Sequence, residues 1–265
     1  MNLLIGLFAW SDITKLQVPE GFEIQEFVTE IDDARQMVEG SNFIFVGTKS
    51  AGNVYAIDKN NANKVTVILT ELDMPTGVAL KNGDLYIAET DTIHVVKNIE
   101  EKLSSNKEIT TEIFFSDLPR KTMWNPVTKA WHGWKWIDFG PDGALYISEG
   151  VPCNVCDEDD PRYGTILKLE NNNLSIFADG VRNSVGFDWH PVSQEMYFTD
   201  NGRDWMGDDI PPCELNRVVS PGDHFGFPFI HGKNIPDDKF KAPKDFTFSQ
   251  PVWEFQAHTA PSVSY

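Results

Sequence analysis

The stretch WIDFGPDGALYIS, residues 136–148, decides the fold prediction. Residues 136–139 are a largely apolar run that predicts a buried strand. Gly140-Pro141-Asp142-Gly143 predicts a tight turn, because Pro fixes φ and Gly accepts positive φ. Residues 144–148 predict the returning strand. The stretch therefore predicts a β-hairpin, and His132 stands just before its first strand.

Similar hairpins recur along the chain. The other three are predicted at residues 34–37 with 43–46, 75–80 with 85–88, and 184–189 with 196–199. A further strand is predicted after each hairpin (53–58, 92–97, 165–169 and 215–219) and another before each (22–27, 65–69, 112–115 and 174–177). Four strands per unit, repeated every roughly 40–60 residues, are typical of β-propeller blades. No long amphipathic helix pattern appears, which disfavours a βαβ fold.

The repeats predict four blades and the start of a fifth. The fourth unit ends near Val219, residues 220–250 predict a connection, and residues 251–265 predict the beginning of the next unit. Blades bury their faces only by stacking around an axis, so we expect residues 19–265 to form an incomplete propeller, a fragment of a longer chain. Residues 1–18 predict either the remnant of an export signal or a first strand, since their apolar part is too short to span a bilayer.

The composition of the chain argues against a nucleic acid as its partner. The chain has 265 residues, 41% of them hydrophobic, and a formal net charge of −18. Nucleic-acid binding is disfavoured, because it depends on clustered Lys and Arg. The acidity is typical of a soluble extracytoplasmic protein, periplasmic or secreted, or of carboxylates near a metal ion; most of these charges serve solubility. No stretch predicts a stable membrane span.

The three cysteines argue against two kinds of site, covalent haem attachment and a zinc ribbon. Cys153 and Cys156 form a C-x-x-C pair and Cys213 stands alone. Asp157 follows the pair where covalent haem attachment needs His, and a zinc ribbon would need a second pair. The pair is therefore expected to brace a loop, either as a disulfide or as free thiols.

Several short motifs occur in a characteristic order. They are WH at 131–132 with FGPDG at 139–143, GVRN at 180–183, TDNGRD at 199–204, GDD at 207–209, ELN at 214–216, HFGFP at 224–228 and TAP at 259–261. With these motifs the chain, from about residue 20 onward, resembles the soluble quinoprotein glucose/sorbosone dehydrogenases and their pyranose dehydrogenase relatives. The resemblance implies an all-β, six-bladed propeller that uses pyrroloquinoline quinone and calcium to oxidise a sugar or related alcohol.

The resemblance also implies roles for individual residues. His132 matches the general base, which alcohol oxidation requires because hydride leaves more readily as the oxygen loses its proton. Arg182 and Asn183 match a pair that contacts the quinone, whose carboxylates suit a guanidinium. The remaining implied contacts are cofactor contacts from Asn201 and His258, and calcium ligation by the main-chain carbonyls of Gly202 and Arg203.

Three features have more than one interpretation at the level of sequence. In the glucose-oxidising members an Asp follows the Gly that closes the His strand and orients the His, whereas here Val151 follows Gly150. Glu149 or Asp157 would have to substitute. The tryptophans at 131, 134 and 136 can stack on a sugar or on the quinone. The acidic cluster, which either supports calcium or is a solvated loop, comprises Asp204, Asp208, Asp209 and Glu214.

Two other functions are compatible with a propeller. One is a calcium-dependent hydrolase of the lactonase type, which needs carboxylate and Asn ligands from several blades, whereas only one carboxylate-rich loop is evident. The other is a non-catalytic propeller that binds a protein or a glycan. A dehydrogenase would require a small-molecule substrate and an external electron acceptor, and the sequence names neither.

Overall fold

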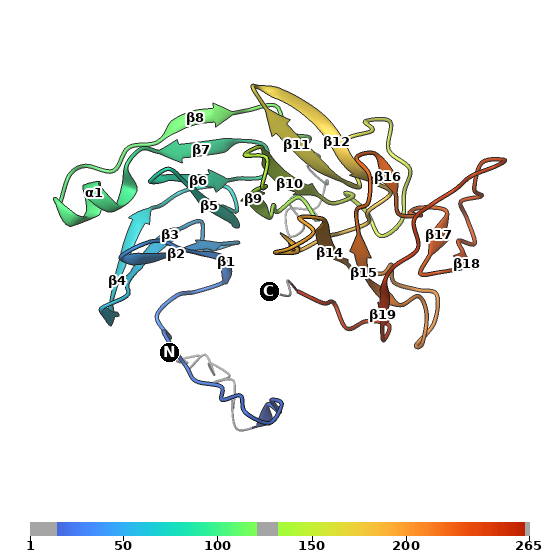
Figure 1. Cartoon of the computed structure of the whole chain (residues 1–265), viewed down its shortest axis with the longest axis horizontal. Coiled ribbons are helices and arrows are strands. Elements are labelled where there is room, and N and C mark those ends of the chain that lie inside the picture. Colours follow the sequence, from blue (N-terminus) through green and yellow to red (C-terminus); the bar gives the residue numbers. More distant parts are fainter. Residues whose placement is uncertain (1–14, 121–131, 263–265) are drawn as a thin grey trace, which may run out of the picture.

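The computed structural model describes residues 15–120 and 132–262 (Figure 1). Most of the N-terminal segment, expected to be a signal remnant or a first strand, lies outside the described residues. Its described part, residues 15–18, forms no strand. Among the described residues, no helix has the length and apolar character needed to cross a membrane.

Four antiparallel sheets form successive blades around a central axis, and this confirms the all-β propeller with four blades. The first blade contains β1 (Ala34–Glu39), β2 (Phe43–Thr48), β3 (Val54–Asp58) and β4 (Asn61–Leu69). The second contains β5 (Gly77–Lys81), β6 (Asp84–Ala88), β7 (Ile93–Val96) and β8 (Glu112–Phe115), with the short helix α1 (Ile99–Ser104) before β8. Strand β1 faces the centre and β4 the periphery (Figure 1).

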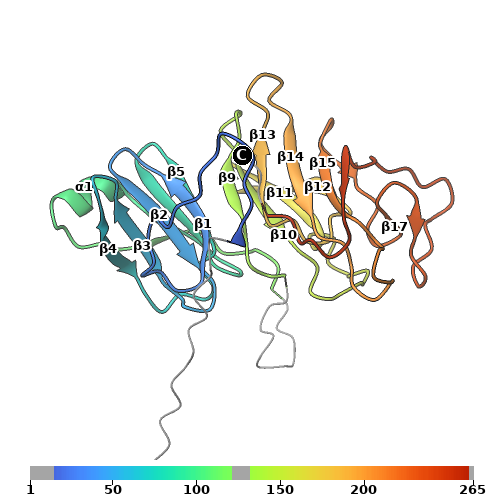
Figure 2. The same ribbon diagram turned by 90° about the horizontal axis from the view of Figure 1, so that it is seen from below.

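The third and fourth blades follow the same plan. The third contains β9 (Ile137–Phe139), β10 (Leu145–Glu149), β11 (Thr165–Glu170) and β12 (Asn173–Asp179), to which β16 (Asp223–His224) adds in parallel. The fourth contains β13 (Phe187–Trp189), β14 (Met196–Asp200), β15 (Cys213–Arg217) and β19 (Trp253–Phe255). A small hairpin contains β17 (Ile230–His231) and β18 (Ile235–Pro236). The sheets follow one another across the molecule, ending at β17 (Figure 2).

Three expectations about strands are corrected. The strands at 65–69, 112–115 and 174–177, predicted to precede the hairpin of their own unit, are instead β4, β8 and β12, each in the blade before that hairpin. The segment from residue 251, predicted to begin a fifth unit, instead supplies β19, which pairs with β15 as the outer strand of the fourth blade. Residues 22–27, predicted as a strand, form none. A strand needs a hydrogen-bonded neighbour, and this segment pairs with no described strand, leaving Phe22 exposed.

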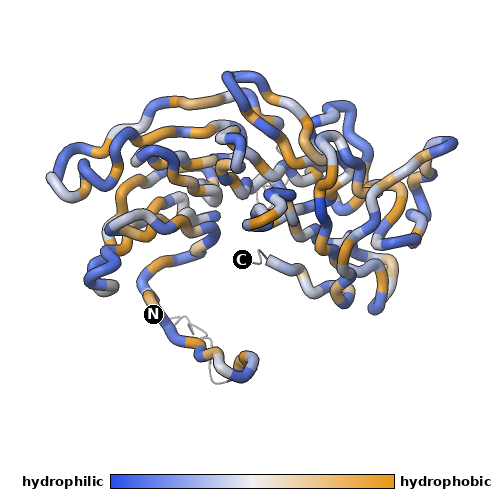
Figure 3. The backbone as a smooth tube through the Cα atoms, viewed as in Figure 1, coloured by the Kyte–Doolittle hydropathy of each residue, from blue (hydrophilic) through white to orange (hydrophobic). Residues whose placement is uncertain are grey.

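The hydrophobic core lies between neighbouring blades. One cluster joins the first two blades through Phe45, Val54, Leu85 and Ile87, and others join the second to the third and the third to the fourth. Blades packed on both faces need apolar residues at successive positions, which explains runs such as residues 43–46. The apolar segments accordingly gather in the strands (Figure 3).

One buried side chain joins three blades near the axis. Gln36 of β1 donates from Nε2 to the carbonyl of Ile137, 2.7 Å away. Its Oε1 accepts from the main-chain N–H groups of Ile137 and Val78, at 3.1 and 3.2 Å. These bonds set the spacing of the inner strands β1, β5 and β9 around the central cavity.

Candidate active site

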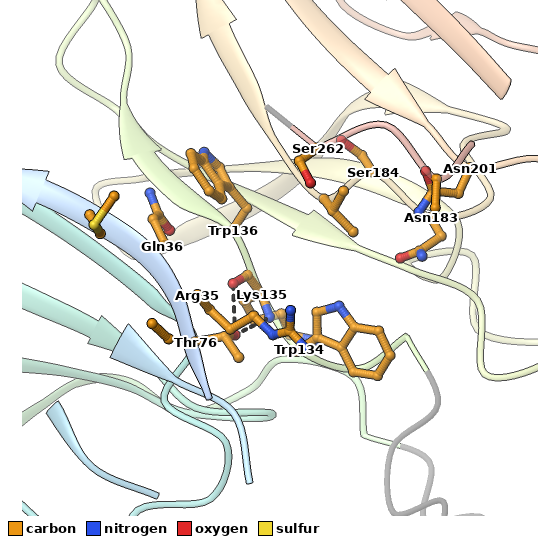
Figure 4. Close-up of a pocket in the computed structure, with 14 residues that line it drawn as sticks. Arg35, Gln36, Thr76, Trp134, Lys135, Trp136, Asn183, Ser184, Asn201 and Ser262 are labelled. Atoms are coloured by element: carbon orange, nitrogen blue, oxygen red, sulfur yellow. Dashed lines mark hydrogen bonds between the residues drawn. The ribbon is translucent and has the colours of Figure 1, made fainter. Parts of the chain in front are cut away.

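A cavity of about 450 Å³ lies at the centre of the arc of blades, a volume that suits a small organic ligand. Inner strands and loops from every blade contribute to its wall. The polar and aromatic lining residues are Arg35, Gln36, Thr76, Trp134, Lys135, Trp136, Asn183, Ser184, Asn201 and Ser262. Asn183 and Asn201 lie together on one side of the cavity, away from Trp134 (Figure 4). Trp131 lies outside the described residues.

His132 is buried just before β9, and its ring is oriented by the main chain. Its Nδ1 lies 2.9 Å from the carbonyl oxygen of Val151. A carbonyl can only accept, so Nδ1 carries the proton and Nε2 is the basic nitrogen. Burial, followed by the nearby Arg182 cation, lowers the pKa of His132 to about 3. The imidazole is therefore neutral near neutral pH, as a general base must be.

This geometry changes the expectation that an acidic side chain orients His132. The Val151 carbonyl takes that place. Glu149 instead pairs with Lys135, with Nζ–O distances of 2.8 and 2.7 Å and both side chains fully buried. Burial raises the pKa of Glu149 to about 7, against the opposing charge of Lys135. The pair connects the end of β10 to the segment that carries His132.

The sequence contained a signal for this pair that motif reading missed. In the β9–β10 hairpin, Ile137 pairs with Ile147. Extending that antiparallel register by two residues brings position 135 opposite position 149, and opposite charges at directly facing positions attract.

Gly150 brings two site residues together. A Cβ atom at this position would lie 2.7 Å from both Cβ and O of His132, and 3.1 Å from Oδ1 of Asn183. Only a residue without a side chain permits this approach. The contact joins the His132 segment of the third blade to the Asn183 loop before the fourth.

Asp200, at the end of β14, holds the main chain of Arg182 and Asn183. Its two carboxylate oxygens accept the N–H groups of these residues at 2.8 and 2.6 Å. Asn183 then lines the central cavity. Arg182 is buried behind it, in a small neighbouring pocket that Asn201 and Gly202 also line.

The loop closed by the Cys153–Cys156 disulfide contacts both halves of the site, and the disulfide confirms one of the two expected states of this pair. Arg182 donates from Nε to the carbonyl of Asn154 at 2.8 Å and from Nη2 to its Oδ1 at 3.0 Å. The same loop contains Val151, which orients His132. Sequence reasoning did not single out Asn154.

Of the other predicted site residues, Asn201 lines the cavity, whereas Arg203 and His258 do not. Asn201 lines the cavity, and its buried Oδ1 has no hydrogen-bond donor within the described residues. The Arg203 side chain is buried and pairs with Asp237 and Asp238. His258 is exposed, with Nε2 2.9 Å from the carbonyl oxygen of Gly207, and it does not line the cavity.

No group of three or more His, Cys, Asp or Glu side chains that could hold a metal occurs within residues 15–120 and 132–262. In the predicted acidic cluster, Asp204, Asp208 and Asp209 are exposed, while Glu214 is buried and lines the small pocket that Asn201 and Gly202 also line. The calcium prediction rests on main-chain carbonyls and the Oδ1 of Asn201. Amide and carbonyl oxygens are donors that calcium accepts.

Comparison with known proteins points to one family. The family model described as glucose/sorbosone dehydrogenase matches residues 88–265. An uncharacterised protein of Borreliella burgdorferi is 35% identical over 281 residues, covering 98% of this chain and 71% of that protein.

Solved structures share the fold. The quinone-bound aldose sugar dehydrogenase of Streptomyces coelicolor superposes with a TM-score of 0.65 at 18% identity, covering 88% of this chain and 71% of that one. The pyrroloquinoline quinone domain of pyranose dehydrogenase from Coprinopsis cinerea gives 0.65 at 12% identity, covering 88% and 67%. The apo aldose sugar dehydrogenase of Escherichia coli gives 0.58 at 15% identity, covering 85% and 73%.

Proposed function

The chain belongs to the glucose/sorbosone dehydrogenase family, and on this basis we propose that it oxidises a sugar or related alcohol with pyrroloquinoline quinone and calcium. The observation that carries the proposal is the hydrogen bond from His132 Nδ1 to the Val151 carbonyl. It holds a neutral imidazole in the tautomer whose Nε2 accepts a proton. A base of this kind is what alcohol oxidation requires.

His132 removes the hydroxyl proton of the substrate as the neighbouring carbon gives up hydride, so a carbonyl product forms. Pyrroloquinoline quinone would supply the two-electron acceptor for this hydride when bound. The low pKa of His132 keeps Nε2 unprotonated before substrate arrives.

The cavity contains groups that fit the cofactor and its metal. Asn183 and Asn201 present amide groups to the cavity, and Asn201 Oδ1 still lacks a donor within the described residues. This oxygen, with the main-chain carbonyls of Gly202 and Arg203, would ligate calcium. The buried Arg182 cation behind Asn183 would attract the carboxylates of the quinone. The cofactor contact of His258 stays a prediction from the family resemblance. Its ring does not line the cavity.

We further propose that the protein works in the periplasm or outside the cell and passes electrons to an external acceptor. The Cys153–Cys156 disulfide supports this location, because such bonds persist in oxidising compartments.

The test is a titration of the purified protein with pyrroloquinoline quinone and calcium chloride, followed by absorbance and by sugar-dependent dye reduction. We expect a cofactor absorbance shift, and dye reduction that needs both additions. Absence of the shift, or of reduction across a panel of aldoses and sugar acids, would refute the proposal. A non-catalytic binding propeller would then be favoured.

A further inference from the structure

A lysine that motif reading passed over lies close to the candidate base. Lys49 follows β2, and its Nζ lies 3.7 Å from the ring centroid of Trp134. The Trp134 ring in turn meets the His132 ring edge-on, with centroids 5.9 Å apart. The ammonium group is therefore placed over an aromatic face within a short distance of the proton-accepting ring.

A second cation faces the same region. Arg35 of β1 lines the same cavity as Trp134. Burial, and then the charge of Arg35, lower the pKa of Lys49, while Asp33 acts in the opposite direction. Repulsion from Arg35 is therefore one contribution to the pKa of Lys49, and solvent screens it because the Arg35 side chain is 48% exposed.

Few carboxylates lie close enough to neutralise the charges of Lys49 and Arg35. In the part of the chain that the structure describes, Lys49 forms no ion pair with a carboxylate, and Arg35 reaches only Asp33, 3.7 Å away. The other oxygen of that carboxylate accepts the Ser50 N–H group. Two weakly compensated cations beside a cavity are notable in a chain whose formal net charge is −18.

We propose that Arg35, which lines the cavity, and Lys49, which lies over the lining residue Trp134, form an anion subsite that binds the carboxylate or phosphate of an acidic sugar. The inference rests on the proposed dehydrogenase function and adds the substrate class. An anion between these cations relieves their repulsion and provides the missing partner, and such charge-assisted contacts are strong and directional. Trp134, which also lines the cavity, supplies apolar surface beside the part of its ring that Lys49 covers, and a sugar ring can pack there.

The substrate is the favoured source of the anion because of where Lys49 lies. Its charge acts on His132, the residue that receives the substrate's proton. The carboxylates of the quinone would bring the same chemistry. Experiment can distinguish the two sources. If the anion belongs to the substrate, substitution of Lys49 or Arg35 weakens substrate binding, and if it belongs to the quinone, the same substitution weakens cofactor binding.

The experiment compares matched sugar pairs that differ only in an anionic group, such as glucuronate against glucose and glucose 6-phosphate against glucose. With the full chain, quinone and calcium, we expect kcat/KM to be roughly tenfold to a hundredfold higher for an acidic member, mainly through KM. The preference should weaken as salt increases. Lys49→Gln and Arg35→Gln should each reduce it by about tenfold, while Lys49→Arg should retain most of it.

Lys64→Gln is the matched control, because Lys64 is an exposed lysine of the same blade that pairs with Asp58. It should leave the preference unchanged. Calorimetric titration of glucuronate and glucose 6-phosphate into each variant measures binding without turnover, and quinone affinity is measured separately.

The outcomes separate the two proposals. Equal or better use of neutral sugars by the unaltered protein refutes the anion subsite and leaves the dehydrogenase function intact. Weakened quinone binding in the variants, with unchanged affinity for sugar acids, also refutes it and assigns the cations to the cofactor. Absence of quinone binding and of all turnover refutes the dehydrogenase function, and calorimetry then still decides whether the cations bind a sugar anion.

Discussion

Arg182 donates two hydrogen bonds to Asn154, one to its carbonyl at 2.8 Å and one to its side-chain Oδ1 at 3.0 Å. The same Oδ1 also accepts the N–H group of Asp204 at 2.8 Å. Asn154 lies inside the disulfide-closed turn, three residues after Val151, whose carbonyl orients His132. One loop therefore positions both the candidate base and the buried cation.

Asn154→Ala should weaken quinone binding. The substitution leaves one guanidinium N–H group and one main-chain N–H group without their acceptor, and such a loss costs about 1–3 kcal/mol. We expect a matching decrease in the free energy of unfolding, measured with denaturant, and a raised cofactor Kd. Asn60→Ala, at an exposed turn, is the control. Unchanged cofactor affinity would show that Asn154 does not position Arg182 for binding.

His132→Ala should abolish turnover while leaving cofactor binding intact. Removal of a general base lowers kcat by roughly 10²- to 10⁴-fold. Dye-reduction kinetics and the quinone absorbance titration check the two parts separately. Turnover equal to that of the unaltered protein would remove His132 from the mechanism.

The pH profile should reflect the low pKa of His132. Burial and the nearby cations Arg182 and Lys49 favour the neutral ring, against the Val151 carbonyl, so the pKa falls to about 3. The base form therefore persists well below the ordinary histidine pKa of about 6.5. We expect kcat/KM to stay level as the pH falls from about 7.5 to about 5, measured with a pH-insensitive electron acceptor. Loss of activity with a midpoint near 6.5 would contradict this assignment.

Gly150→Ala should reduce both kcat and stability, with the larger effect on kcat. The added methyl group would meet both Cβ and the main-chain O of His132 at 2.7 Å and crowd Asn183, so the His132 main chain must shift along with the Asn183 side chain. We expect a loss of about 1–3 kcal/mol in stability and at least roughly a tenfold fall in kcat, since small displacements of reacting groups are costly.

A second glycine provides the comparison. Gly83 has a φ of +83°, and a Cβ there meets only Asn98 Oδ1 at 4.0 Å. Gly83→Ala should therefore reduce stability by about 1–2 kcal/mol through backbone strain and leave kcat unchanged. Equal effects of the two variants on kcat would mean that Gly150 acts only through stability.

Lys135→Met should be strongly destabilising, because it leaves the fully buried Glu149 carboxyl without its partner. Breaking a buried ion pair in this way costs about 3–5 kcal/mol. The double variant Lys135→Met/Glu149→Leu should recover much of that loss. The control, Lys168→Met, breaks a partly exposed pair with Asp142 and should cost at most about 1 kcal/mol. Chemical denaturation of the four proteins measures all three differences.

Much of the fold followed from local sequence patterns. The hairpin at residues 136–148 appears as β9 and β10, and the predicted strands after each hairpin are β3, β7, β11 and β15. Alternation of apolar and polar residues, and continuous apolar runs, predict strands reliably when the two strands of a hairpin are close in sequence. The outer strand of the fourth blade was misassigned, because β19 pairs with β15 across the connection that contains the β17–β18 hairpin.

The sequence by itself determined that the chain is an acidic, all-β propeller, and which motifs carry its candidate site, because strand period, turn residues and motif order are local properties. Only the tertiary structure decided how those motifs act. It oriented His132 through a main-chain carbonyl, which is common to every residue type and leaves no mark in sequence. It also brought Lys49 of the first blade over Trp134 of the third. Contacts between blades depend on how the sheets pack around the axis, and no local pattern encodes that packing.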